Sequence, residues 1–121
     1  MNPIEFISTL QASYFAPDAL AHVAHMVNNV PPLRAQHDDY EHLAYLHYLN
    51  NTTDEHWYIT ELNPETMQAF GWVYGTEQAG YENIDLARLL STMDVGFDTR
   101  FKPVLVDVLE KVHGVTTGAG T

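Results

Sequence analysis

The chain contains no cysteine and no long apolar run. Without cysteine it cannot form a disulfide, a thiol nucleophile or an iron–sulfur site, and this absence fits a reducing compartment. No stretch approaches the roughly 18 consecutive apolar residues of a transmembrane helix. The first residues, MNPIEFISTL, lack the basic region and the apolar segment of a signal peptide. We therefore expect a cytoplasmic protein.

Positive charge is also scarce. The chain has 5 Lys and Arg residues against 16 Asp and Glu residues, and the 53 residues between Arg34 and Arg88 contain no Lys or Arg at all. A field of one negative sign repels phosphate, which disfavours binding to nucleic acid or to an anionic membrane. The same field attracts basic proteins and speeds encounter with them. Solubility, or adaptation to a salty cytoplasm, accounts for this charge equally well.

The length and composition predict one globular domain. With 121 residues, 45% of them apolar, the chain can bury a core without a disulfide or a structural metal. We expect the domain to span residues 1–114, followed by a flexible tail of small and polar residues at 115–121. The predicted fold class is α+β. It consists of a three- or four-stranded antiparallel meander with helices packed on one face, two short N-terminal helices and a C-terminal helix.

Apolar residues alternate in three consecutive segments, 43–49, 56–62 and 67–74, which predicts three strands joined by short turns. Both alternating sets of the first segment are largely apolar, so this strand is predicted to be covered on both faces. Gly71 inside the third segment predicts a bulge or the close approach of another backbone. Residues 96–101 are predicted to form a short fourth strand.

Caps and prolines mark four predicted helices, at about residues 2–14, 17–28, 83–90 and 103–113. The third is predicted to be capped by Asn83, whose side chain suits the first turn of a helix. The fourth is predicted to end at Gly114, because glycine readily adopts the left-handed conformation that closes a helix.

Histidines are frequent in the segment HDDYEHLAYLH, but their spacing does not suit a metal site. His42 and His47 lie five residues apart and point to opposite faces of a strand, and His37 can approach only through a loop. His22 and His25 lie three apart on a predicted helix but have no partner motif. A zinc site needs three or four convergent ligands. No metal or other cofactor is therefore predicted.

Glu61 and Glu77 are the carboxylates considered for catalysis. A pair across a hairpin can do acid/base work if an apolar setting keeps one of them protonated. A glutamate at a strand end more often accepts a hydrogen bond from a backbone amide or from a tyrosine hydroxyl, here Tyr74 or Tyr81. The sequence has no nucleophile elbow, phosphate-binding loop or dinucleotide fingerprint. No catalytic residue is predicted, and a non-enzyme is favoured over an enzyme.

A protein-binding surface is predicted from acidic side chains and tyrosines. Tyr58 and Tyr74 are expected on an outer face of the sheet, where tyrosine ringed by carboxylates suits a protein partner. The predicted binding residues are Asp38, Asp39, Glu41, Asp54, Glu55, Glu65, Tyr58 and Tyr74.

Several short motifs follow one another between residues 30 and 103. They are Val30-Pro31-Pro32-Leu33, Trp57-Tyr58-Ile59-Thr60-Glu61, Phe70-Gly71, Glu77-Gln78-Ala79-Gly80-Tyr81, the segment 83–90 and Phe101-Lys102-Pro103. In this order they resemble domain-of-unknown-function family 2958, small uncharacterised proteins of phages, plasmids and other bacterial mobile elements. Val30 stands where that family tends to have leucine, and the N-terminal helical segment is particular to this chain. The resemblance implies a cytoplasmic accessory protein of a mobile element, and no activity.

Charge and resemblance together lead to a functional hypothesis. The chain is predicted to be an acidic, non-enzymatic binding protein of a phage or mobile element. It would engage a basic nucleic-acid-binding site on a host protein in the bacterial cytoplasm, as a DNA mimic and counter-defence inhibitor of the anti-CRISPR or anti-restriction type. It would contact neither nucleic acid nor membrane directly. Two alternatives stay open: a small hydrolase using Glu61, Glu77 and a histidine, or a homodimeric accessory protein.

Overall fold

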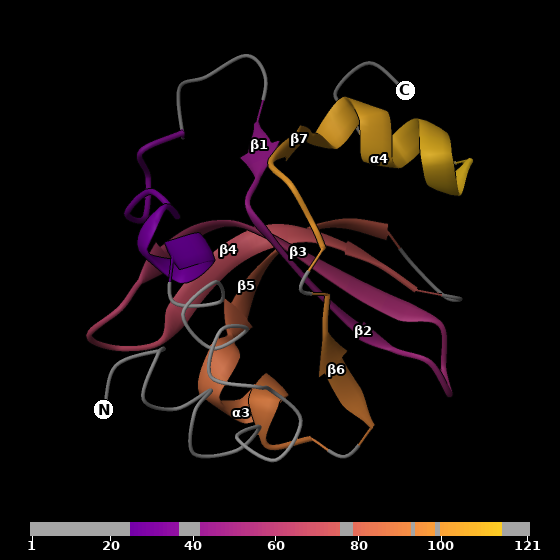
Figure 1. The fold of residues 1–121 in the computed structure, drawn as a ribbon, viewed down its shortest axis with the longest axis horizontal. Helices are drawn as coiled ribbons and strands as arrows, with labels where there is room; N and C mark the ends of the chain where they lie inside the picture. The colour runs from indigo at the N-terminus through magenta and orange to yellow at the C-terminus, as the bar shows by residue number, and fades with distance from the viewer. Residues whose placement is uncertain (1–24, 37–41, 76–78, 93, 99, 115–121) are drawn as a thin grey trace.

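The computed structural model describes residues 25–36, 42–75, 79–92, 94–98 and 100–114. Its centre is a five-stranded antiparallel sheet with the strand order β5-β4-β3-β2-β6 (Figure 1). The strands are β2 (Leu46–Asn50), β3 (Glu55–Asn63), β4 (Gln68–Tyr74), β5 (Ala79–Asp85) and β6 (Val95–Phe97). A second sheet has two strands and pairs β1 (Leu43–Ala44) with β7 (Val104–Leu105). The α+β class and the meander of β2, β3 and β4 are thus confirmed.

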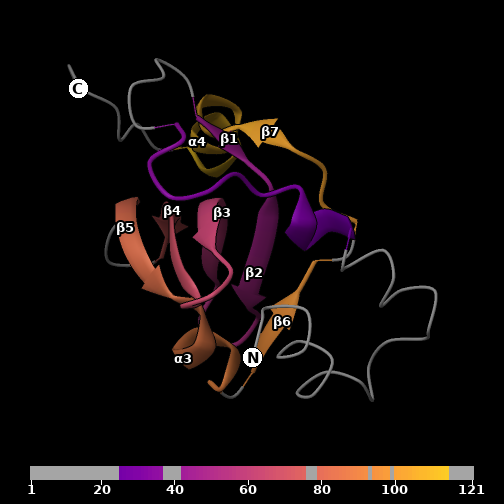
Figure 2. The same ribbon diagram turned by 90° about the vertical axis from the view of Figure 1, so that its left-hand side faces the viewer.

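Two helices lie on opposite faces of the larger sheet (Figures 1 and 2). They are α3 (Leu86–Leu90) and α4 (Val106–His113), and residues 25–28 add a helical turn. On the α3 face a buried cluster joins Ile59 to Leu86 and also includes Met26 of that turn. On the α4 face a second cluster joins Tyr58 to Val106. The prediction that helices pack on one face only is therefore wrong, because alternate residues of β3 are buried beneath helices on both sides.

Two asparagine side chains hold the turns of the meander and so fix the register of its strands. The side-chain oxygen of Asn50 accepts hydrogen bonds from the backbone amides of Thr52 and Thr53, at 2.9 and 3.2 Å. Asn63 holds the next turn in the same way. Such turns are a common role for asparagine between strands. Asn50 ends β2 directly opposite Glu55 at the start of β3, so this turn places Asp54 and Glu55 at one end of the sheet.

The prediction that a helix begins at Asn83 is wrong. Residues 79–85 form β5, which pairs with β4 along its full length. The helix begins only at Leu86, and the side chain of Asp85 accepts the cap hydrogen bond from the amide of Arg88. The sheet consequently has five strands, where three or four were predicted.

Two other predicted boundaries also shift. The segment 43–49 is interrupted at Tyr45, so it contributes both β1 and β2. The last helix begins at Val106, because residues 104–105 pair with β1. Its predicted end is confirmed: Gly114 has the left-handed φ of 71°. The first N-terminal helix and the tail at 115–121 lie outside the described residues. Within the described ranges, no helix has the length and apolarity needed to cross a membrane.

Candidate functional site

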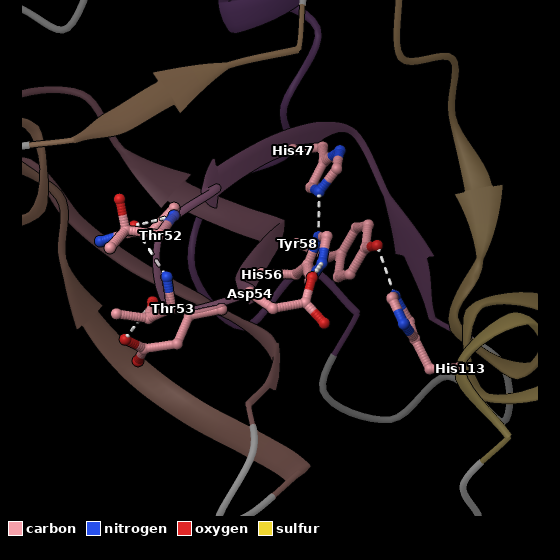
Figure 3. A network of polar contacts seen from close by, with 9 residues as sticks. His47, Thr52, Thr53, Asp54, His56, Tyr58 and His113 are labelled. Atoms are coloured by element: carbon pink, nitrogen blue, oxygen red, sulfur yellow. Dashed lines mark hydrogen bonds and ion pairs between the residues drawn. The ribbon is translucent and has the colours of Figure 1, made fainter.

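Two histidines on neighbouring strands form the centre of a polar chain (Figure 3). His47 Nε2 lies 2.9 Å from His56 Nδ1. The other ring nitrogens contact carboxylates: His47 Nδ1 lies 3.0 Å from Asp98 Oδ2, and His56 Nε2 lies 3.1 Å from Asp54 Oδ1. The β2–β3 register pairs His47 with Tyr58, which places His56 diagonally beside His47 on the same face. A continuous chain of Asp, His, His and Asp therefore runs along the α4 face of the sheet.

Aromatic rings join this chain to α4. The His47 ring stacks on Tyr58, with centroids 4.4 Å apart and planes 8° apart. The Tyr58 hydroxyl lies 2.7 Å from Nε2 of His113, the last residue of α4 (Figure 3). His113 in turn stacks on Tyr74 with a centroid distance of 4.1 Å. We call these residues the histidine cluster: His47, Asp54, His56, Tyr58, Tyr74, Asp98 and His113.

The contacts of the two central histidines require a defined number of protons. Three contacts link Asp98, His47, His56 and Asp54, and each needs one hydrogen between its two atoms. Two neutral imidazoles carry only two ring protons, one each. All three contacts therefore coexist only when the histidine pair carries one extra proton, and so a single positive charge between two carboxylates. A second extra proton breaks the His47–His56 hydrogen bond, because both facing nitrogens would then be donors.

Burial favours the neutral forms of three residues of the cluster, His47, His113 and Tyr58. Burial lowers the pKa of His47, which outweighs the opposing effect of Asp98. Burial also lowers the pKa of His113, helped by the nearby His56. Tyr58 stays a neutral phenol, because burial raises its pKa to about 12. A neutral His47 that donates from Nδ1 to Asp98 has Nε2 free to accept from His56, which fits its two contacts at 3.0 and 2.9 Å.

A pocket of about 440 Å³ lies on the same face of the sheet. It is lined by Leu33, Arg34, His42, Glu61, Phe70, Tyr81 and Asn83. Glu61, Phe70 and Asn83 are cross-strand partners in one row over β3, β4 and β5. The volume is typical of sites for small molecules. No member of the histidine cluster lines this pocket, so the two are separate candidate sites.

Glu61 holds residues 34–36, which lie next to the pocket, through hydrogen bonds to their backbone. Its two carboxylate oxygens accept hydrogen bonds from the backbone amides of Arg34 and Gln36, at 3.0 and 2.6 Å. The side-chain amide nitrogen of Gln36 donates to the carbonyl oxygens of Leu43 and Thr60, and its side-chain oxygen accepts from the amide of Leu43. The expectation that Glu61 accepts from a backbone amide is confirmed. The pocket brings Glu61 and His42 together as the hydrolase alternative requires, but both oxygens are already bound, which favours a positioning role.

The structure brings only some of the predicted binding residues together. Asp54 and Glu55 lie in and just after the turn between β2 and β3, whereas Glu65 lies in the turn after β3. A nine-residue strand separates these ends by roughly 26 Å. The expectation that Tyr58 lies on an outer face is wrong, because Tyr58 is 4% exposed under α4. Tyr74 is half-buried against His113.

Six residues considered in the sequence analysis lie outside the described residues: His22, His37, Asp38, Asp39, Glu41 and Glu77. The prediction that His42 and His47 point to opposite faces of one strand fails, because the chain is interrupted at Tyr45 between them. His42 lines the pocket and His47 belongs to the histidine cluster, both on the α4 face. In the described part of the chain, no group of three or more His, Asp or Glu residues is arranged to hold a metal ion.

Sequence reasoning missed His56, Asp98 and His113. A signal for His56 exists: the hairpin register that follows from the Asn50 turn places it diagonally beside His47. Asp98 and His113 reach the cluster only through the pairing of β6 with β2 and the docking of α4, which local patterns do not specify. In comparisons with known proteins, no family model, no curated protein and no solved structure matches this chain.

Proposed function

We propose that this chain is a non-enzymatic binding protein whose acidic surface engages a basic site on a partner protein. The observation that carries the proposal is the meeting of two acidic turns at one end of the sheet. Asn50 pairs with both Glu55 and Val95, so Asp54 and Glu55 lie at the same end as Asp94. Neither turn contains a Lys or an Arg. Clustered carboxylates of this kind attract a basic partner over a distance set by the ionic strength.

The two turns present their carboxylates on a defined backbone. Asp54 and Asp94 are exposed, and their φ angles of 58° and 70° lie in the left-handed region. Aspartate tolerates this region better than most residues, and it occurs there mainly in turns. The Asn50 side chain holds the first turn through two backbone amides. Ordered carboxylates lose less conformational entropy on binding than mobile ones, which supports a binding role.

The proposed partner is a nucleic-acid-binding enzyme of the host. Such enzymes carry basic channels that complement a surface of negative charge. The resemblance to proteins of mobile elements gives this partner a biological setting: a counter-defence inhibitor that occupies the nucleic-acid site of a restriction or CRISPR effector. The net charge of −11 supports binding to a basic protein over direct binding to nucleic acid.

A charge-reversal experiment tests the proposal. The tagged chain is incubated with a bacterial lysate that contains defence enzymes, washed at about 0.05 M or 0.5 M salt, and its bound proteins are identified. The test variant carries Asp54→Lys and Asp94→Lys. The control carries Glu65→Lys and Asp107→Lys, which change the net charge equally but lie away from the two turns.

We expect a basic nucleic-acid enzyme to be retained at low salt and released at high salt. The control variant should retain this protein, whereas the turn variant should lose it. The purified partner should likewise bind the purified chain at low salt and release it at high salt. The proposal fails if nothing specific is retained at either salt, or if the turn variant retains the partner as well as the parent does.

A further inference from the structure

We propose that the pocket lined by Glu61, His42 and Asn83 binds a nucleoside-sized nitrogen heterocycle that carries N–H donors and no phosphate. This inference does not depend on the proposed binding to a basic protein. It rests on the floor of the pocket, the unused hydrogen-bonding capacity of its lining residues, its aromatic wall and the charge around it.

The floor is a row of three residues on paired strands. Glu61 of β3 pairs with Phe70 of β4, and Phe70 pairs with Asn83 of β5. Side chains in such a row point to the same face of a sheet. Regular strands thus place a carboxylate, a phenyl ring and a primary amide side by side, and rigid elements of this kind position binding groups accurately.

Several polar groups at the pocket have hydrogen-bonding capacity left. An ionised carboxylate offers about four acceptor sites, and the backbone amides of Arg34 and Gln36 use two of those on Glu61. His42 Nδ1 is buried without a hydrogen-bond partner among the described residues. A buried ring nitrogen left unpaired is costly, so such a group in a pocket wall is a candidate ligand contact. Asn83 adds both a donor and an acceptor.

One wall of the pocket is aromatic and open. The rings of Phe70 and Tyr81 are nearly parallel, with planes 5° apart and centroids 5.6 Å apart. Tyr81 and Leu33 both line the pocket, and both remain 37% exposed although they are large and largely apolar. Burial raises the pKa of Tyr81 to about 12, so its hydroxyl stays protonated as a donor. A planar ring can cover this surface by stacking, as bases do on aromatic side chains.

The charge of the surroundings selects against phosphate. Glu61 lines the pocket, and Glu110 and Asp107 act on Tyr81 at its wall. Among the described residues of the lining, Arg34 is the only Lys or Arg. The molecule as a whole carries −11. A heterocycle with N–H groups satisfies the free acceptor sites of Glu61, whereas a phosphate would add repulsion from the same carboxylate. The structure thus points to nucleosides over nucleotides.

Calorimetric titration of the full chain with adenosine, guanosine, cytidine and uridine tests the inference, with the corresponding 5′-monophosphates run alongside. We expect at least one nucleoside to bind saturably and its monophosphate to bind more weakly. Asn83→Ala should weaken binding about threefold to tenfold through the loss of a hydrogen bond. Tyr81→Ala should weaken it about tenfold or more through the loss of stacking.

Asn51→Ala is the matched control, because Asn51 is exposed in the turn between β2 and β3, away from the pocket. Its affinity for the nucleoside should equal that of the parent, and so should that of the Asp54→Lys and Asp94→Lys variant used above. The inference is overturned if no nucleoside binds saturably, if both pocket variants bind as the parent does, or if a monophosphate binds as tightly as its nucleoside. These outcomes leave the proposed protein-binding function unaffected.

Discussion

At the scale of single residues, Gly71 leaves no room for a side chain between β4 and the backbone of β3. A Cβ built on Gly71 would lie 2.1 Å from the carbonyl oxygen of Tyr58, although ordinary contacts begin near 3.4 Å. That oxygen belongs to the backbone of β3, which shifts register just beyond Ile59. We expect Gly71→Ala to lower the free energy of unfolding by about 1–3 kcal/mol or more, because the two central strands must move apart.

Gly80→Ala is the matched control for this prediction. Gly80 lies in β5, the neighbour of β4, and a Cβ there would meet nothing within 4 Å. Its unfolding free energy should equal that of the parent or exceed it slightly, since alanine restricts the unfolded chain more than glycine does. Urea denaturation of both variants measures the difference. Equal losses of stability in the two variants would contradict a steric cause at Gly71.

The close approach at Gly71 could be predicted from the sequence, because a glycine inside an alternating strand usually marks a bulge or a site where another backbone comes near. The burial of Tyr58 could not. Alternation indicates which residues share a face of a strand, and Tyr58 and its neighbour Ile59 do lie on different faces of β3. Whether a face is open or covered depends on where distant segments dock. Here α4 covers Tyr58, and its His113 contacts the hydroxyl.

At the scale of elements, the start of α3 depends on Asp85. Its side chain accepts from the amide of Arg88 at 3.2 Å, which satisfies one of the free amides in the first turn. Asp85→Ala should therefore lower the free energy of unfolding by about 0.5–2 kcal/mol. Asn83→Ala should have almost no effect, because Asn83 lies within β5. Chemical denaturation of the two variants checks this, and the reverse order of effects would place the cap at Asn83.

The sequence around β5 carries the signals of a helix start, yet residues 79–85 form a strand. Asn83 and Asp85 are both good caps, so local preference does not choose between them. Of the residues in the middle of β5, Tyr81, Glu82 and Asn83 are all exposed, and only Ile84 is buried. An edge strand with this pattern shows no clear alternation, so pairing with β4 decides its structure. Such tertiary pairing overrides weak local propensity.

The interruption at Tyr45 has a similar origin. Alternation over residues 43–49 is continuous in the sequence, but the backbone divides between two partners. The Tyr45 amide donates to the carbonyl oxygen of Ile59 in β3, at 2.8 Å. One residue earlier, Ala44 pairs with Val104 of β7 instead. The chain thus passes from one sheet to the other within a single residue, which a periodic pattern cannot indicate.

At the scale of the whole molecule, the two-sided core was partly visible in the sequence. The first predicted strand has apolar residues in both alternating sets, which requires a cover on both faces. That cover is provided by α3 and the turn at 25–28 on one side and by α4 on the other. The prediction of helices on one face alone did not follow this signal through. The pocket could not be predicted, because its lining comes from β3, β4, β5 and two loop segments.

The pH dependence of stability combines two opposing effects. A lower pH reduces the net charge of −11 and its self-repulsion, which stabilises the fold. His47 and His113 act in the opposite direction, since burial lowers both of their pKa values below the ordinary 6.5. As the pH falls through 6.5, these two histidines take up protons first in the unfolded chain. Their contribution to stability is therefore fully present above that pH and is lost below it.

Replacing one of these two histidines isolates its contribution. His113 is influenced by His56, Asp54 and His47, and its ring contacts Tyr58 and Tyr74. From about pH 7.5 to about pH 5.5, His113→Gln should lose less unfolding free energy than the parent, because its unfolded chain no longer gains that proton. The control His25→Gln changes an exposed histidine and should follow the parent, and His47→Gln should behave like His113→Gln. If the His113→Gln and His47→Gln variants both followed the parent curve, the charge of the whole surface, and not the histidine cluster, would govern stability in this range.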